Sequence, residues 1–183
     1  MTRNRYVLLD RDGVINEDSD QFVKSPDEWR PIPGSLEAIA LLTAHGFKVV
    51  VITNQSGIAR GLFDLAMLDE IHQKMLRLVA ENGGRIEAVY FCPHGPESAC
   101  DCRKPKPGLL KTFAAEHLAD LHDAVLIGDS LRDIRAAEAV GVRAILVKTG
   151  KGLKTLNTNP DLKIPVFDNL YDAAHSLVAG QEF

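Results

Sequence analysis

The chain has 183 residues, of which 45% are hydrophobic and 25% charged, and this balance excludes wholesale disorder. With 21 Lys and Arg against 25 Asp and Glu, the net charge of -4 argues against a nucleic-acid binder that relies on bulk positive potential. No apolar run reaches the roughly 18–20 residues of a membrane span, and residues 1–5 do not resemble a signal peptide. We therefore expect one cytoplasmic domain over residues 1–183, monomeric, with no nucleic-acid or membrane partner.

Short aliphatic runs alternate along the chain with longer patterns of helical spacing. The runs predict strands at 6–9, 48–52, 88–91, 124–127 and 144–147. The patterns predict helices at 35–45, 108–116, 131–139 and 170–178, and a long helix capped by Asp64. This order indicates an α/β fold with a doubly wound, mostly parallel sheet.

Two segments between these elements carry weaker signals. The polar segment 16–34 contains three prolines and is interpreted as a small flap folded over the edge of the sheet. The stretch 149–165 is interpreted as a surface loop.

Polar residues follow the predicted strands, where open α/β sheets place their ligands. Asp10 and Asp12 come directly after the first strand and before Gly13. Such a pair can hold a cation or divide acid/base work, and one carboxylate can attack phosphorus while the other transfers protons. Two aspartates that only form a turn remain the alternative.

Asp129 and Asp133 follow the fourth predicted strand at a spacing of i and i+4. Asp129, at a strand end, is placed to join Asp10 in holding Mg²⁺, which takes few carboxylates together with phosphate and water. Capping of the next helix by Asp129 or Ser130 is the alternative.

A third candidate group offers hydrogen bonds and positive charge to a phosphate. Thr53 is followed by Asn54, Gln55 and Ser56, which supply a hydroxyl, amides and turn N–H groups. The pair 103–104, Arg103 and Lys104, can bring cations to the same place. A simple turn and a solvated basic pair are the alternatives.

The three cysteines lie within eleven residues and alternate with a histidine. Cys92, His94, Cys100 and Cys102 match the three thiolates and one imidazole of a closed tetrahedral zinc site in a loop at 92–102. Buried structural cysteines are the alternative. The other histidines lie on helical or connecting segments, and none is expected in a site. The sequence contains neither a nucleotide-binding P-loop nor a serine-hydrolase elbow.

Four of these motifs, in this order, resemble the haloacid dehalogenase superfamily of phosphotransferases. The run from Asp10 to Val14 resembles its first motif, Thr53 and Asn54 its second, Lys104 its third, and Gly128 to Asp133 its fourth. No sizeable cap domain fits between them.

The resemblance implies roles for these residues. Asp10 is the nucleophile and Asp12 the general acid/base, while Thr53 and Lys104 stabilise the transferred phosphoryl group. Mg²⁺ is implied on Asp10, Asp129 and the backbone carbonyl of Asp12, with an aspartyl-phosphate intermediate.

Within the superfamily, the chain is similar to a zinc-containing branch. Its members remove the 7-phosphate of D-glycero-D-manno-heptose 1,7-bisphosphate, in ADP-heptose and lipopolysaccharide-core biosynthesis, or hydrolyse histidinol phosphate. Residues 53–61 and 147–150 favour the heptose substrate, whereas the five-residue gap before Cys100 favours histidinol phosphate. Arg103 and residues 53–56 are implied as substrate contacts. A nucleic-acid end phosphatase and a non-catalytic zinc-loop binding module are the further alternatives.

Overall fold

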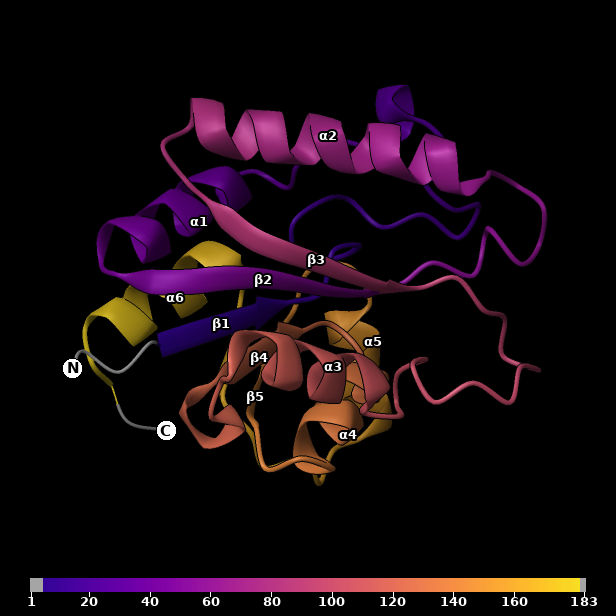
Figure 1. The fold of residues 1–183 in the computed structure, drawn as a ribbon. Coiled ribbons are helices and arrows are strands. Elements are labelled where there is room, and N and C mark those ends of the chain that lie inside the picture. Colours follow the sequence, from indigo (N-terminus) through magenta and orange to yellow (C-terminus); the bar gives the residue numbers. More distant parts are fainter. Residues whose placement is uncertain (1–4, 182–183) are drawn as a thin grey trace.

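The computed structural model describes residues 5–181, and its centre is a parallel β-sheet (Figure 1). The strand order is β3-β2-β1-β4-β5-β6, and each neighbouring pair is parallel. The strands are β1 (Arg5–Leu9), β2 (Phe47–Asn54), β3 (Ile86–Cys92), β4 (Val125–Gly128), β5 (Arg143–Val147) and β6 (Val166–Phe167). The doubly wound parallel sheet predicted from the alternating pattern is confirmed.

Helices cover both faces of this sheet. They are α1 (Ser35–Ala44), α2 (Leu65–Glu81), α3 (Gly108–His117), α4 (Leu131–Glu138), α5 (Gly152–Thr158) and α6 (Leu170–Val178), with short 3-10 helices η1 (Pro26–Glu28) and η2 (Leu121–Asp123). Val7 and Leu9 of β1 belong to the core under α1, α2 and α6, while Tyr6 and Leu8 belong to the core formed with α3 and α4. Because successive strand residues point to opposite faces, β1 is buried on both.

The long helix α2 begins as its sequence predicts. The Asp64 side chain accepts a hydrogen bond from the backbone N–H of Met67 at 2.8 Å, which satisfies one of the free amides of the first turn. Ile71 and Met75, one turn apart, are fully buried against the sheet. The direction of α2 is therefore fixed at its start by the cap and along its length by one apolar face.

The interpretation of 149–165 as a surface loop is wrong, because this stretch contains α5 and leads into β6. Gly152, at the start of α5, approaches β5 so closely that a Cβ atom there would overlap the Val147 carbonyl oxygen. The glycine that suggested a loop is thus needed for helix packing. Leu156 packs against the core under α4, which explains why a seven-residue helix of modest propensity is stable.

The segment 16–34 is anchored more firmly than its polar composition indicates. Trp29 is fully buried in the core beside Ile15 and Val23. Lys74 of α2 donates hydrogen bonds from Nζ to the carbonyl oxygens of Pro26 and Trp29, at 2.6 and 2.9 Å. One half of the segment is therefore part of the core, and the half before Val23 borders the cleft described below.

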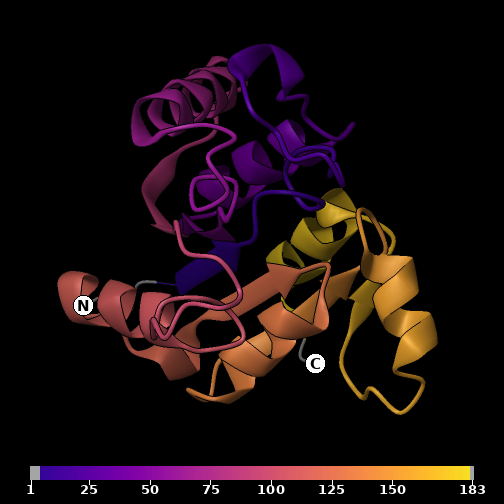
Figure 2. The same ribbon diagram turned by 90° about the vertical axis from the view of Figure 1, so that its right-hand side faces the viewer.

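The loops that follow the strands gather at the carboxyl end of the sheet. In Figure 1 this is the right-hand side, and Figure 2 views the molecule from there. Leu9 of β1 pairs with Val51 of β2 on one side and with Ile127 of β4 on the other, so the residues after these three strands meet. Among the described residues, no helix is both long and apolar enough to cross a membrane.

Candidate active site

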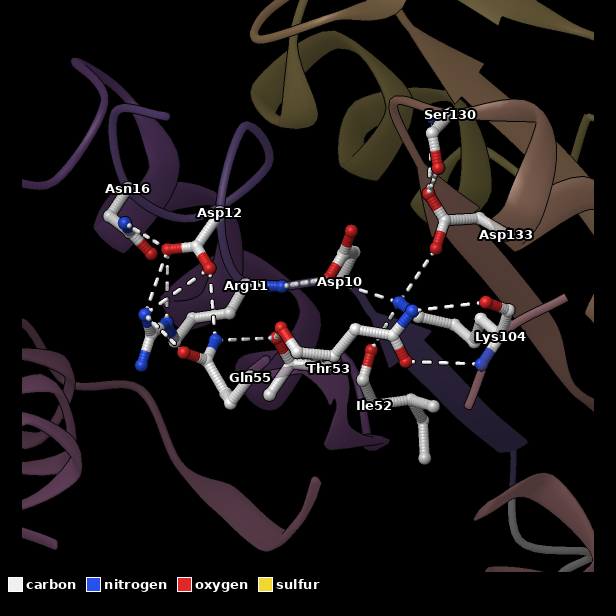
Figure 3. A network of polar contacts seen from close by, with 11 residues as sticks. Asp10, Arg11, Asp12, Asn16, Ile52, Thr53, Gln55, Lys104, Ser130 and Asp133 are labelled. Carbon is white, nitrogen blue, oxygen red and sulfur yellow. Dashed lines mark hydrogen bonds and ion pairs between the residues drawn. The ribbon is translucent and has the colours of Figure 1, made fainter. Parts of the chain in front are cut away.

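Three carboxylates meet at the carboxyl end of the sheet: one directly follows β1, one directly follows β4, and one lies in the first turn of α4. Oxygen atoms of Asp10, Asp129 and Asp133 lie within 4.8 Å of one another. Lys104, which is buried, reaches them from the loop before α3, and its Nζ lies 3.1 Å from Asp10 Oδ1 and 2.6 Å from Asp133 Oδ1 (Figure 3). One ammonium group thus faces three carboxylates.

Local backbone geometry places these carboxylates. Ser130 is the N-cap of α4, and its backbone N–H and hydroxyl both donate to Asp133 Oδ2, so the predicted capping is present. Asp129 is confined from two sides by glycines. A Cβ atom on Gly13, whose φ is +84°, or on Gly150 would collide with Asp129 Oδ2. The backbone N–H of Lys151 donates to that same oxygen at 2.8 Å.

The crowding of negative charge alters the pKa values of the group. Burial, and then the charge of Asp133, raise the pKa of Asp10 to about 7. Burial, and then the charge of Asp10, raise the pKa of Asp129 to about 8. Burial alone would lower the pKa of Lys104, but Asp10 and Asp133 outweigh it and raise the value. The oxygen-rich donor set, held together at a cost in electrostatic repulsion, fits a hard divalent cation such as Mg²⁺.

Asp12 is held differently, although it lies only two residues beyond Asp10. Its Oδ1 accepts hydrogen bonds from the Arg11 guanidinium, at 2.9 Å, and from Asn16, at 2.8 Å, and its Oδ2 accepts from Gln55 at 2.9 Å (Figure 3). Burial would raise the pKa of Asp12, but the Arg11 charge and these hydrogen bonds prevail and lower it. The carboxylate of Asp12 stands outside the group of Asp10, Asp129 and Asp133.

The predicted phosphate-binding residues lie beside these aspartates. Asn54 is hydrogen-bonded twice to the backbone of Lys104, donating to its carbonyl at 3.1 Å and accepting from its N–H at 3.0 Å. Gln55 donates to Thr53 Oγ1 as well as to Asp12. These two amides therefore position neighbours, and Thr53 is almost fully buried beside them.

A cleft of about 320 Å³ opens over these groups. Most of the residues predicted for the site line this cleft, whereas Thr53 does not. The predicted residues that line it are Asp10, Asp12, Asn54, Gln55, Ser56, Arg103, Lys104 and Asp129. Arg60, Arg132 and Lys151 also line it and were not predicted as site residues, although Arg60 lies in the run 53–61 and Arg132 in the motif from Gly128 to Asp133. Lys151 is placed there by α5, the element that the sequence did not reveal.

The cysteines and His94 form the second predicted cluster. The four ligand atoms of Cys92, His94, Cys100 and Cys102 lie within 4.8 Å of one another. Cys92 Sγ lies 3.1 Å from Cys102 Sγ and 3.8 Å from Cys100 Sγ, whereas a disulfide bond is about 2.05 Å long. Separations of 3–4 Å among three sulfurs and one imidazole nitrogen fit the edges of a zinc tetrahedron.

Two buried residues behind Asp12 were missed by the sequence analysis. Arg11 is fully buried although it is charged, and His72 of α2 is nearly so. Arg11 Nη1 lies 3.1 Å from His72 Nε2. The position of an arginine between two aspartates was the available signal for Arg11, while no local pattern marks His72.

The chain is similar to a known protein family and to individual known proteins. The family described as HAD-hydrolase-like matches residues 101–173. The D-glycero-beta-D-manno-heptose-1,7-bisphosphate 7-phosphatase of Pseudomonas aeruginosa is 50% identical over 172 residues, which cover 94% of this chain and 97% of that protein. The enzyme of the same name from Bordetella bronchiseptica is 55% identical over 152 residues, covering 83% of this chain and 85% of its own.

A solved structure is similar to this chain as well. The crystal structure of D,D-heptose 1,7-bisphosphate phosphatase from B. bronchiseptica, complexed with magnesium and phosphate, has a TM-score of 0.94 and 49% sequence identity. It covers 97% of this chain and 99% of that one. This chain and that enzyme therefore have the same fold and similar sequences over nearly their whole length.

Proposed function

Because the chain belongs to the D-glycero-β-D-manno-heptose-1,7-bisphosphate 7-phosphatase family of HAD-like hydrolases, we propose that it hydrolyses the 7-phosphate of that sugar bisphosphate. It is then a phosphoric monoester hydrolase whose substrate is a small sugar phosphate. The observation that carries the mechanism is the contrast between Asp10 and Asp12, which face one cleft from the end of one strand in opposite electrostatic surroundings.

Asp10 is the nucleophile in this proposal. Its carboxylate attacks the phosphorus of the 7-phosphate in line with the departing O7, and the P–O7 bond breaks as an aspartyl phosphate forms. Lys104, 3.1 Å from Asp10 Oδ1, offsets negative charge on the phosphoryl oxygens, and Asn54 holds the Lys104 backbone in place. Ser56 lines the cleft beside this phosphate, while Thr53 lies buried behind it and accepts a hydrogen bond from Gln55.

Asp12 transfers the protons. It donates a proton to O7 as the sugar leaves, and it then accepts a proton from the water that attacks the aspartyl phosphate. Phosphate is released and the Asp10 carboxylate is regenerated. Asp12 enters the first step protonated and leaves it ionised, and the hydrogen bonds from Arg11, Asn16 and Gln55 favour that ionised form, which the second step requires.

The metals have separate tasks. Mg²⁺ would be held by Asp10, Asp129 and the backbone carbonyl of Asp12, with Asp133 beside them, and when bound it supplies positive charge to the phosphoryl oxygens. Zn²⁺ would be held by Cys92, His94, Cys100 and Cys102, whose four ligands leave no open position. The zinc set is structural, and it fixes the loop from which Arg103 and Lys104 extend.

Three arginines in one part of the cleft favour a bisphosphate over histidinol phosphate. Arg60, Arg103 and Arg132 line the cleft, and within residues 5–181 none of them forms an ion pair with a carboxylate. Burial, and then the positive charge of Arg132, lower the pKa of Arg103, so this part of the cleft is short of negative charge. A second phosphate supplies that charge, whereas the ammonium group of histidinol phosphate would be repelled.

The direct test compares phosphate release from D-glycero-β-D-manno-heptose 1,7-bisphosphate and from histidinol phosphate, side by side in Mg²⁺. We expect a kcat/KM at least about 100-fold higher for the bisphosphate, since a site that offers hydrogen-bond donors to one group of its substrate discriminates strongly against an analogue that lacks this group. Phosphorus NMR of the product should show that the anomeric phosphate remains. A preference for histidinol phosphate would overturn the substrate and leave the proposed chemistry of Asp10 and Asp12 in place.

A further inference from the structure

His72 is a buried histidine that the proposed mechanism does not use. It lies on α2 and outside the cleft, and its Nε2 lies 3.1 Å from Arg11 Nη1. Burial, and then the charge of Arg11, lower the pKa of His72 to about 3, so the ring is neutral. A neutral imidazole beside a guanidinium must accept the hydrogen bond at Nε2, and it carries its own proton on Nδ1.

Arg11 links this ring to the proton-transferring carboxylate. Its Nε and Nη2 donate to Asp12 Oδ1 at 3.2 and 2.9 Å, and Nη2 also contacts Gln55 Oε1 at 3.3 Å. The third nitrogen, Nη1, points to His72. The guanidinium is planar, so a partner at Nη1 and a partner at Nε and Nη2 together fix its position and orientation.

A fully buried guanidinium is stable only when its N–H groups are hydrogen-bonded. Without an acceptor at position 72, Nη1 would be left unsatisfied, and Arg11 would turn toward whatever acceptor or solvent it could reach. Asp12 would turn with it, because two nitrogens of Arg11 bind its Oδ1. The geometry of the acid/base therefore depends on a residue that never touches the substrate.

We propose that His72 is a positioning residue for phosphoryl transfer: it holds Arg11, and through Arg11 it holds the Asp12 carboxylate at the place where the leaving oxygen and the attacking water pass. This inference rests on the proposed roles of Asp10 and Asp12. It predicts that His72 contributes to proton transfer and contributes little to substrate binding.

The test compares His72→Leu, which removes the acceptor, with His72→Gln, whose amide oxygen can accept from Arg11. On heptose bisphosphate, we expect His72→Leu to lower kcat about 10- to 100-fold with KM within about 2-fold, because part of a general acid/base contribution is lost. His72→Gln should recover most of kcat. Met75→Leu, a conservative change on the buried face of the same helix, is the structural control and should leave kcat unchanged.

A second substrate separates positioning of Asp12 from general damage. In single turnovers with 4-nitrophenyl phosphate, the leaving group needs no proton, so His72→Leu should slow release of 4-nitrophenol less than about 3-fold. An equal loss on both substrates, an unchanged kcat on the bisphosphate, or a Gln variant no better than Leu would overturn the proposal.

Two further controls keep the outcomes distinct. If His72→Leu does not fold, His72→Asn takes its place, since the shorter amide does not reach Arg11. If the wild-type protein leaves heptose bisphosphate untouched, the proposed substrate fails, and the His72 comparison is made on the alkyl phosphate that the wild type hydrolyses fastest. In that case the same pattern of losses supports the role of His72 and its absence overturns it.

Discussion

The two sides of the cleft each hold an aspartate, and the electrostatic surroundings of the two aspartates are opposite. On one side, Asp10 is crowded by Asp129 and Asp133, and within residues 5–181 Lys104 is the cation paired with this group. On the other side, Asp12 accepts hydrogen bonds from a buried guanidinium and from two side-chain amides. The pKa of Asp10 is raised to about 7, while that of Asp12 is lowered.

This difference shows where the protein supplies its own positive charge and where it leaves the charge to a ligand. Around Asp10 the protein supplies too little positive charge for three carboxylates, and a bound divalent cation can supply the rest. Around Asp12 the protein supplies the positive charge and the hydrogen bonds itself. The proposed nucleophile and the proposed acid/base therefore have different surroundings, although only one residue lies between them.

The largest expected effect comes from removing the proposed nucleophile. Asp10→Asn replaces the carboxylate that we propose attacks phosphorus with a neutral amide, so kcat should fall by about a thousandfold or more. The substitution also relieves repulsion in the carboxylate group, and the variant should fold. Steady-state phosphate release and circular dichroism measure the two outcomes. Turnover near the wild-type rate would contradict the role of Asp10.

A moderate effect is expected from disturbing Asp129 through its backbone neighbour. In Gly13→Ala the new Cβ collides with Asp129 Oδ2, and we expect the affinity for Mg²⁺ to fall about 10-fold, as measured by calorimetric titration. Gly46→Ala is the matched control, because its φ of +78° imposes similar backbone strain with no atom within 4 Å of the new Cβ. Equal Mg²⁺ affinity in the two variants would contradict the confinement of Asp129.

An effect on folding, and not on ligand binding, is expected on the side of Asp12, in the pH dependence of stability. The pKa of His72 is lowered to about 3 in the folded protein, against about 6.5 in the unfolded chain, where the ring binds a proton more readily. Stability is therefore fully present above pH 6.5 and falls as the pH drops toward 3, by up to about 1.4 kcal/mol per pH unit from this group. Urea unfolding at pH 7, 6 and 5 measures it.

His72→Gln provides the comparison for that measurement, because it keeps an acceptor for Arg11 and does not titrate. The carboxylates titrate in both proteins, so their contributions cancel in the difference. The wild type should lose stability relative to the variant as the pH falls. Parallel curves for the two proteins would show that His72 does not remain neutral in the fold.

Much of the site could be predicted because parallel strands deliver their carboxyl ends to one edge. Asp10 and Asp129 follow β1 and β4, and Thr53 lies near the end of β2; these three strands are neighbours, so no side-chain information was needed to bring the residues together. The cysteines and His94 are close in sequence, so their cluster was equally local.

The rest depended on packing across long stretches of chain. His72 and Arg11 are 61 residues apart, and their contact requires the rotation of α2 about its own axis, which the apolar pattern fixes only coarsely. The helix α5 was missed because its stability comes from Leu156 and from the close approach of Gly152 to β5. Propensity alone gives no sign of either.

The central position of β1 has a consequence for synthesis of the chain on the ribosome. β1 pairs on one side with β2, the next strand in the chain. Its partner on the other side is β4, whose pairing begins at Val125. At about 5–20 residues per second, the β4 side of β1 waits for several seconds with its backbone groups unpaired. During that time the apolar strand edge is open to other chains, and Asp10 is not yet beside Asp129. A nascent chain therefore exposes an unpaired edge of a buried strand before the residues of the candidate site have come together, and rapid completion of the chain limits the time in which other chains can pair with that edge.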